Sequence, residues 1–330
     1  MARLGRANMK ILFYSYPWAM DIPGGGERQM FAYASHLRQF EIEVSWYDMW
    51  NPSFDRNEIF HVFSVMPGVI EMCDYVKRRG LKLVVSPNLW VTHETRENYS
   101  RDVCNILKLA DRVIVNSNME GDALSDVYGV AREKFHTVFN GSETVFIDSA
   151  DARIFRNRFA IDGPYVLNVA NVEPRKRQLE FVRVLRQERP DLKLVIVGGI
   201  RDKSYASACL AEGKENLSMV GTLPYASEML RSALAGCEYF AMPSLLETPS
   251  LAAIEAATAG VKILLTSGGS TVEYFGRSVT WLDPESPDSI RAGIAAVESA
   301  TPEHSTWLAR DRLLWPKVVR ELVNVYKALV

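Results

Sequence analysis

The sequence has few cysteines, and they lie far apart. The four cysteines are Cys73, Cys104, Cys209 and Cys237, and no two of them are spaced as CxxC. Zinc sites and small disulfide-bonded folds both depend on closely spaced cysteines. We therefore expect neither a zinc site nor a disulfide framework, which fits the reducing environment of the cytoplasm.

The sequence also lacks an excess of positive charge and long apolar runs. Its formal net charge is -2, so nucleic acid is not expected as the main partner, because binding to a phosphate backbone needs a basic excess. No apolar run approaches the roughly 20 residues of a membrane-spanning helix, and the N-terminal segment lacks the apolar stretch of a signal peptide. We expect a cytoplasmic protein, with any membrane contact peripheral and at the inner face.

The pattern that is present is an alternation of strands and helices. The chain has 330 residues, of which 48% are hydrophobic, enough for about two domains with buried cores. Short β-branched and aromatic runs alternate with helical patterns, which is typical of βαβ units and parallel sheets. The first half contains the runs KILFYSY, EIEVSWY, HVFSV, LKLVVS, DRVIVNS and FHTVF, and the second half contains YVLNVA, LKLVIVGG, NLSMVG, EYFAMPS, VKILLTS and SVTWLD.

A break in this pattern separates the two halves. The segment 140–165 shows no sustained period and is rich in turn-forming residues, so it is the expected linker. We predict a first domain over residues 1–155 and a second over 156–311. Apolar residues at helical spacing near the C-terminus predict a helix over 312–330 that joins the first domain. Ligands of such sheets bind beyond the carboxyl ends of the strands.

The stretch LLETPSLAAIEAATAG contains a helix start with the features of an anion site. Pro249 suits the first position of a helix, and Thr248 before it suits the N-cap. The first backbone N–H groups of a helix have no partner within the helix, and the helix dipole is positive there. The amides of Ser250, Leu251 and Ala252 are therefore a candidate phosphate site.

Two glutamates flank this helix start. Glu255 falls on the second turn of the helix, one residue off its apolar face, where we expect it at the edge of a cleft. Glu247 lies in the loop before the helix, where a sugar hydroxyl is a more favourable partner than a phosphate. A surface charge that complements the helix dipole is the alternative reading of such a glutamate.

These residues and their surroundings resemble glycosyltransferase family 4. PSLLETPSLAAIEAATAG resembles the E-x7-E signature of that family, YVLNVANVEPRKRQ its first strand and phosphate-binding turn of the C-terminal lobe, and ADRVIVNS its N-lobe strands. The resemblance covers roughly residues 9 to 300. It implies an α/β protein of the GT-B class, with two Rossmann-like doubly wound domains that face a central cleft.

The resemblance assigns roles to the residues near the E-x7-E stretch. Glu255 matches the glutamate that binds the ribose of the nucleotide, and Glu247 matches the one that contacts the donor sugar. Lys176 matches the lysine that neutralises the donor pyrophosphate, a role for a long mobile cation. Pro249 and Ser250 stand where the family commonly has an aromatic residue and a glycine.

Other positions implied for the donor site depart from the family in part. Asn171 stands where the family usually has an arginine, which weakens the electrostatic clamp on phosphate. Arg175, Arg177 and Arg201 are alternative cations, and the sequence does not choose among them. The remaining implied donor-site residues are Gly198, Gly199 and Glu273.

A glycine loop near the N-terminus is the implied site for acceptor or phosphate. Gly24, Gly25 and Gly26 let the backbone approach a ligand closely, and the family has a comparable glycine pair. A simple flexible turn is the alternative. Many relatives carry a histidine after the fourth strand of the N-lobe, where this chain has Asn88, with His93 following later.

These expectations lead to one leading function and two alternatives. The leading one is a retaining glycosyltransferase that moves a sugar from a nucleotide diphosphate sugar to a carbohydrate or lipid-linked hydroxyl acceptor, in bacterial polysaccharide or glycolipid assembly. The chain has no D-x-D motif, so neither a metal nor another cofactor is expected. The alternatives are a nucleotide-sugar epimerase or hydrolase of the same fold, and a catalytically weak binding subunit of a transferase complex.

Overall fold

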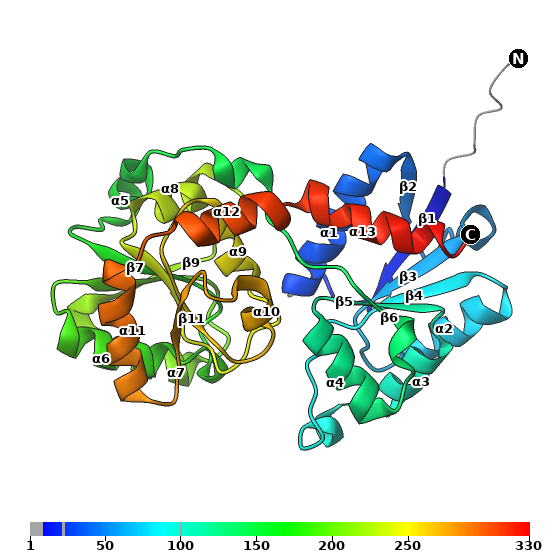
Figure 1. The fold of residues 1–330 in the computed structure, drawn as a ribbon, viewed down its shortest axis with the longest axis horizontal. Coiled ribbons are helices and arrows are strands. Elements are labelled where there is room, and N and C mark those ends of the chain that lie inside the picture. The colour runs from blue at the N-terminus through cyan, green and yellow to red at the C-terminus, as the bar shows by residue number, and fades with distance from the viewer. Residues whose placement is uncertain (1–8, 22–23, 100) are drawn as a thin grey trace, which may run out of the picture. The chain divides into compact units, whose positions relative to one another are not determined.

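The computed structural model describes residues 9–21, 24–99 and 101–330, which form two compact units (Figure 1). The first unit comprises the described residues up to Asn140 together with Trp315–Val330, and the second comprises Gly141–Leu314. Each unit is an α/β structure with a parallel sheet, so the expected fold class is confirmed. None of the helices in the described ranges is long and apolar enough to cross a bilayer.

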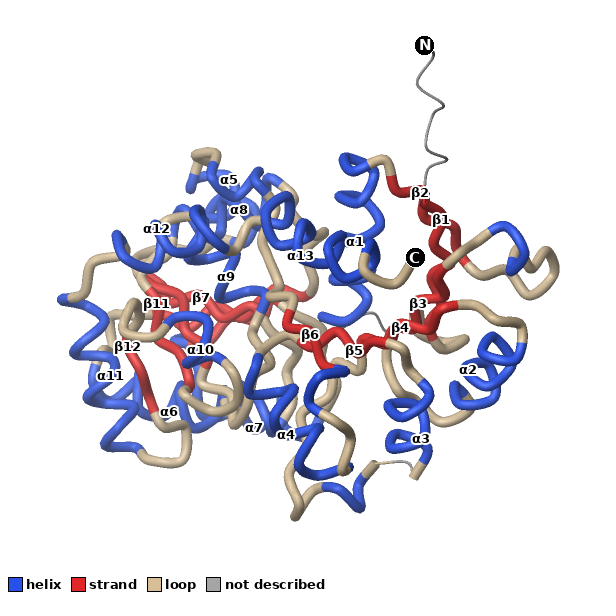
Figure 2. Tube along the Cα trace, turned by 45° about the vertical axis from the view of Figure 1, so that its right-hand side comes forward, coloured by secondary structure: helices blue, strands red, loops and turns tan. Residues whose placement is uncertain are grey.

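The first unit contains a six-stranded parallel sheet with the order β2-β1-β3-β4-β5-β6. Its strands are β1 (Met9–Ser15), β2 (Ile42–Trp46), β3 (Ile59–Phe63), β4 (Lys82–Ser86), β5 (Arg112–Val115) and β6 (Phe135–Thr137). Its helices are α1 (Gly25–Leu37), α2 (Val69–Arg78), α3 (Asp102–Leu109), α4 (Asn118–Tyr128) and α13 (Trp315–Lys327). Within this unit, α1 and α13 cover one face of the sheet, and α2, α3 and α4 cover the other (Figure 2).

The centre of this sheet is buried on both faces, which explains its continuous apolar strands. All five residues of β3 are buried, among them His61. The C-terminal helix α13 packs here by its apolar face, with Tyr33 and Trp315 in edge-to-face contact at 5.9 Å. The Tyr326 hydroxyl lies 2.5 Å from His61 Nδ1. The last helix of the chain is therefore part of the core of the first unit.

The second unit contains a six-stranded parallel sheet with the order β12-β11-β10-β7-β8-β9. Its strands are β7 (Tyr165–Val169), β8 (Lys193–Val197), β9 (Leu217–Gly221), β10 (Tyr239–Met242), β11 (Ile263–Thr266) and β12 (Thr280–Leu282). Its helices are α5 (Ala152–Phe159), α6 (Gln178–Glu188), α7 (Lys203–Gly213), α8 (Glu228–Gly236), α9 (Leu251–Thr258), α10 (Thr271–Phe275), α11 (Pro287–Ser299) and α12 (Glu303–Arg312). Helices α5, α8 and α12 lie on one side of this sheet, and α6, α7 and α11 on the other (Figure 2).

The segment expected to be a linker contains a helix. Residues Ala152–Phe159 form α5, which packs against α8. Phe155 is fully buried, and its backbone N–H donates to Ser232 Oγ at 2.8 Å. The chain therefore passes between the units after Asn140 and again after Leu314, and not at the expected boundaries 155/156 and 311/312.

Candidate functional site

Three loops meet at the carboxyl ends of the strands of the second unit. They follow β7, β10 and β11, and we call residues 171–177, 243–250 and 267–270 the loop cluster. Backbone hydrogen bonds join them: Leu245 N–H donates to Arg175 O at 2.9 Å, and Glu247 N–H donates to Gly268 O at 3.2 Å. Ser270 N–H in turn donates to Glu247 O at 3.0 Å. The topology thus gathers the predicted donor-site residues of this unit at one edge of its sheet.

Lys176 and Glu247 form an ion pair inside the loop cluster. Lys176 Nζ donates to Glu247 Oε1, and the two residues are only 7% and 8% exposed. The sequence assigned Lys176 to a phosphate and Glu247 to a sugar, without predicting that they contact each other. Their opposite charges stabilise each other in a place where a single buried charge is costly.

Two glycines that the sequence reasoning missed allow the loops to approach so closely. A Cβ at Gly268 would lie 2.3 Å from Leu245 O, and one at Gly269 would lie 2.2 Å from Glu247 O. Gly269 also has a φ of +84°, a conformation that favours glycine. The signal available in the sequence was the Gly268-Gly269 pair directly after the β11 run.

Helix α9 begins later than expected, and Thr248 is not its N-cap. The helix starts at Leu251, and its N-cap is Ser250, whose Oγ accepts from Ala253 N–H at 3.4 Å. Ser250 has a φ of 73°, which is not helical, so neither Ser250 nor Pro249 belongs to the helix. The N–H groups of Leu251 and Ala252 have no partner within the helix. The helix start expected to bind phosphate is present, but its cap differs.

The second signature glutamate, Glu255, lies within α9 and is only 1% exposed. It was expected at the edge of a cleft, whereas the structure buries it.

Two serine hydroxyls are buried at the ends of neighbouring strands, Ser244 after β10 and Ser270 after β11. Neither Oγ has a hydrogen-bond partner among the described residues. Buried polar groups of this kind are candidate ligand contacts.

Asn171, which stands where an arginine was expected, holds two loops together. Its Oδ1 accepts from Gly199 N–H at 3.2 Å, and Val172 N–H donates to Gly199 O at 2.8 Å. A Cβ at Gly198 would lie 2.0 Å from Ala170 O. Asn171 and Gly198 therefore hold the loop after β7 tightly against the loop after β8. They supply no cation to the loop cluster.

The remaining charged candidates of the second unit lie closer to solvent. Arg175 pairs with Glu173 at 2.8 Å, and Arg177 pairs with Glu180 at 2.8 Å. Glu273 is half-buried in the first turn of α10. Of the basic residues in the loop cluster, Lys176 is the buried one.

The candidates of the first unit gather at the start of α1. Gly24 is the N-cap of α1, Gly25 and Gly26 begin the helix, and Gly24 N–H donates to Glu27 Oε2 at 2.6 Å. Asn88 lies beside Gly26, since a Cβ there would be 3.1 Å from Asn88 Nδ2.

His93, the other candidate of the first unit, does not show the contacts of a buried site residue. It is exposed, and its Nε2 lies 2.8 Å from the Asp126 carboxylate. The structure therefore places Asn88, and not His93, beside the glycine loop.

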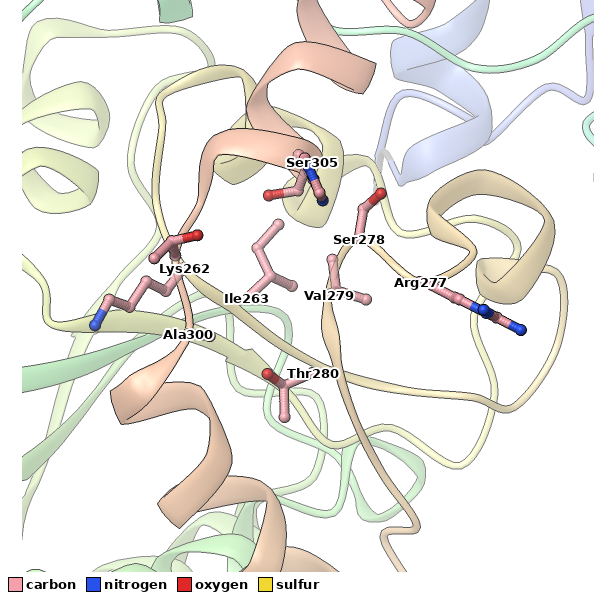
Figure 3. A pocket seen from close by; sticks show the side chains of 10 residues that line it. Lys262, Ile263, Arg277, Ser278, Val279, Thr280, Ala300 and Ser305 are labelled. Carbon is pink, nitrogen blue, oxygen red and sulfur yellow. The ribbon is translucent and has the colours of Figure 1, made fainter.

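A cavity of about 200 Å³ in the second unit lies away from the loop cluster (Figure 3). It is at the amino ends of β11 and β12, where Ile263 and Thr280 begin the two strands. Lys262 Nζ donates to Glu298 O at 2.7 Å, and in Figure 3 the Lys262 and Arg277 side chains point away from each other. We assign no role to this cavity.

No group of three metal-binding side chains occurs within the described residues.

Two doubly wound parallel sheets, the second with a helix start beside paired charges, are the architecture expected for the GT-B class of glycosyltransferases. Solved structures of this class confirm the fold. A sucrose-phosphate synthase from Thermosynechococcus elongatus has a TM-score of 0.76 at 15% identity, over 97% of this chain and 99% of that one. HepE from Anabaena, in complex with UDP and glucose, has a TM-score of 0.80 at 16% identity, over 97% of this chain and 100% of that one.

Sequence comparison identifies the family. Residues 53–146 match the family described as Glycosyltransferase Family 4, and residues 150–310 match Glycosyl transferases group 1. The chain belongs to the glycosyltransferases of the family 4 type. The resemblance inferred from the motifs is therefore confirmed.

The curated relatives are also glycosyltransferases, but the match covers only part of each of them. An uncharacterised glycosyltransferase of Methanocaldococcus jannaschii is 25% identical over 66% of this chain and 60% of its own. A D-inositol 3-phosphate glycosyltransferase of Corynebacterium urealyticum is 26% identical over 71% of this chain and 61% of its own. The chain thus spans about three fifths of the length of these relatives.

Proposed function

We propose that this protein transfers a sugar from a nucleotide diphosphate sugar to a hydroxyl acceptor, with retention of anomeric configuration. The observation that carries the proposal is the buried Lys176–Glu247 pair beside the start of α9. A diphosphate and a sugar together need a cation, free backbone N–H groups and carboxylate acceptors. The loop cluster and the start of α9 supply all three within one unit.

In this proposal the diphosphate competes with Glu247 for the ammonium group of Lys176. Lys176 and the amides of Leu251 and Ala252 would stabilise the charge that develops on the departing diphosphate, the term expected to dominate catalysis. Glu247, once released, would accept a hydrogen bond from a hydroxyl of the donor sugar. Glu255 is assigned to the ribose hydroxyls by its place in the E-x7-E motif.

The proposed reaction needs no group beyond the two substrates. The bond between the anomeric carbon and the diphosphate oxygen breaks, and a bond from that carbon to the acceptor oxygen forms on the same face of the sugar. The acceptor proton passes to the departing diphosphate oxygen. The task of the loop cluster is to stabilise that leaving group.

We further propose a carbohydrate or lipid-linked acceptor and a cytoplasmic protein at the inner face of the membrane. The support for the membrane contact is a pair of exposed apolar side chains in the first unit, Trp50 at 88% and Met49 at 66% exposed, which follow the edge strand β2. Tryptophan side chains favour the membrane interface. Co-sedimentation with anionic vesicles tests this contact: Trp50→Ser should reduce binding, and unchanged binding would refute it.

Product analysis tests the transferase proposal. HepE is seen with UDP and with UDP-glucose, so UDP-sugars are the first donors to test, followed by GDP-sugars. With an acceptor present, the wild type should release nucleoside diphosphate and form a glycoside whose anomeric configuration, read by NMR, matches that of the donor. Release of free sugar or of an epimerised donor would favour a hydrolase or epimerase. Binding without turnover would favour a binding subunit.

Glu255→Gln is the test variant for this assay, and Glu228→Gln is its control. Glu228 is an exposed glutamate in the first turn of another helix of the same unit. Turnover should fall in the first variant and persist in the second. Equal loss in both variants would place the effect outside the proposed donor site.

A further inference from the structure

Two buried hydroxyl groups of the loop cluster have no hydrogen-bond partner. Ser244 and Ser270 are both 0% exposed, and neither Oγ has a donor or an acceptor within reach in the described part of the chain. Only one other serine or threonine there has a buried hydroxyl in this state, Thr306 of α12. A buried hydroxyl without a partner costs free energy. Two of these three hydroxyls thus lie in the loop cluster, where a ligand can supply the missing hydrogen bonds.

The Ser270 hydroxyl takes no part in capping its own helix. Ser270 is the N-cap of α10, but its side chain accepts no backbone N–H, and the Glu273 N–H donates to Ser270 O at 3.0 Å instead. An N-cap serine normally accepts a helix N–H through its side chain. Three other serines of the chain do so, namely Ser117, Ser227 and Ser286. The Ser270 hydroxyl is therefore left for a different partner.

The backbone around both serines is held in place by the contacts between the loops. Ser270 N–H donates to Glu247 O at 3.0 Å. Ser244 directly precedes Leu245, whose carbonyl oxygen would lie 2.3 Å from a Cβ at Gly268. Because the two loops are fixed against each other in this way, little conformational freedom is lost when these hydroxyls bind a ligand.

The groups around these hydroxyls favour a sugar, and not a phosphate, as their partner. Ser270 is bonded through its backbone to Glu247, whose carboxylate repels a phosphate at close range. The diphosphate has its own donors in the proposed function, Lys176 and the amides at the start of α9. A serine hydroxyl can both donate and accept a hydrogen bond, and so can each hydroxyl of a sugar.

We infer that the hydroxyls of Ser244 and Ser270 form hydrogen bonds with hydroxyl groups of the donor sugar and select against deoxy sugars. The inference rests on the proposed transferase function, and it adds two specificity-determining residues to the donor site of the second unit. A site that binds a substrate hydroxyl rejects an analogue without it, because the buried group of the protein is then left unpaired.

Ser244→Ala and Ser270→Ala test the inference, because stability and affinity should respond differently. Each variant removes a buried hydroxyl that has no partner in the free protein, so it should unfold at the same temperature as the wild type or a higher one. Each should bind a nucleotide sugar about fivefold or more weakly. Affinity for the nucleoside diphosphate without sugar should stay at the wild-type value. Calorimetric titrations with UDP-glucose and UDP, and with GDP-mannose and GDP, measure these affinities.

Ser232→Ala is the matched control. Ser232 is also 0% exposed and lies in the same unit, but its Oγ accepts from Phe155 N–H at 2.8 Å and donates to Asp151 O at 2.6 Å. Its loss should lower the unfolding temperature and leave the affinity for nucleotide sugars unchanged. If Ser244→Ala and Ser270→Ala lower the unfolding temperature as much as the control does, their hydroxyls have structural partners and the inference is overturned.

Deoxygenated donors test the selection of the sugar directly. Among singly deoxygenated analogues of the nucleotide sugar that binds best, one should bind the wild type more weakly than its parent but bind an alanine variant as well as its parent does. The inference is wrong if both alanine variants bind the parent within about twofold of the wild type, or if they lose equal affinity for the nucleoside diphosphate alone. In both cases the proposed function stands. If no nucleotide sugar binds the wild type, the proposed function itself fails, and the inference falls with it.

Discussion

Lys176 and Glu247 are paired inside the second unit although 71 positions separate them in the chain. One lies at the end of the loop after β7 and the other in the loop after β10. These strands are neighbours in the sheet, so their carboxyl ends bring the two loops together. Separating this buried cation and anion would leave two unpaired buried charges, which is costly in free energy. A ligand that carries a partner for each charge can replace the pair.

Removing one member of this pair should destabilise the protein more than removing both. Lys176→Met leaves Glu247 buried without its cation, which costs about 3 to 5 kcal/mol. The double variant Lys176→Met, Glu247→Leu leaves no unpaired charge and should recover most of that loss. Urea unfolding without nucleotide measures the free energies. If the loss of stability in the double variant equalled the sum of the losses in Lys176→Met and Glu247→Leu, the two charges would not be coupled.

Gly269→Ala should disrupt the loop cluster more than alanine at a glycine with a similar backbone. Its Cβ would meet Glu247 O at 2.2 Å, while Gly163, with a φ of +76°, has no atom within 4 Å of a built Cβ. Gly163→Ala should cost about 1 kcal/mol for the left-handed backbone alone. Gly269→Ala should cost at least twice as much in urea unfolding. Equal costs would mean that the loop approach is not tight.

Glu120 should make stability depend on pH. Burial raises the pKa of Glu120 to about 7 from its ordinary value of 4.5. Between these values the folded state holds more protons than the unfolded state, so the stability due to Glu120 is complete below about pH 4.5 and is lost as the pH rises to about 7. The difference corresponds to about 3 kcal/mol.

Another buried group acts in the opposite direction, so the comparison has to be a difference. Burial lowers the pKa of His61 to about 3, and its contribution to stability is present above about pH 6.5 and is lost as the pH falls to about 3. Subtracting the unfolding free energy of Glu120→Gln from that of the wild type removes the His61 contribution. This difference should decrease between pH 4.5 and 7. A constant difference would contradict the burial of a titrating Glu120.

The hydroxyl of Tyr326 should matter more than that of another buried tyrosine. Tyr326→Phe leaves His61 Nδ1 buried without this partner, which costs about 1 to 3 kcal/mol. Tyr128→Phe is the control, because the Tyr128 hydroxyl has no hydrogen-bond partner among the described residues. Thermal unfolding of both variants compares them. Equal destabilisation would argue against the link between α13 and β3.

The sequence predicted the two-sheet fold well because parallel strands buried on both faces are continuous apolar runs. The strand Ile59–Phe63 is an example: it overlaps the predicted run HVFSV and begins two residues earlier. Helix α5 was missed because it has only eight residues, of which Phe155 is the buried one, and because it lies in a segment rich in turn-forming residues. The packing of α5 against α8, which local patterns do not encode, decides that this segment is helical.

The site was predictable by residue type but not by contact. The E-x7-E motif identified Glu247 and Glu255, and the neighbouring turn identified Lys176. The pairing of Lys176 with Glu247 depends on strand order, which local patterns do not encode. Thr248 was predicted as the N-cap from residue preference alone, whereas the positive φ of Ser250 moves the helix start to Leu251.

The most direct test of the account is calorimetric titration of the protein with nucleoside diphosphates and their sugars. The account predicts that at least one binds the wild type and the control Glu228→Gln with the same affinity, and that Glu255→Gln weakens binding by roughly tenfold or more. If no nucleotide binds the folded wild type, or if Glu255→Gln binds as tightly as the wild type, the loop cluster of the second unit is not a nucleotide-sugar site.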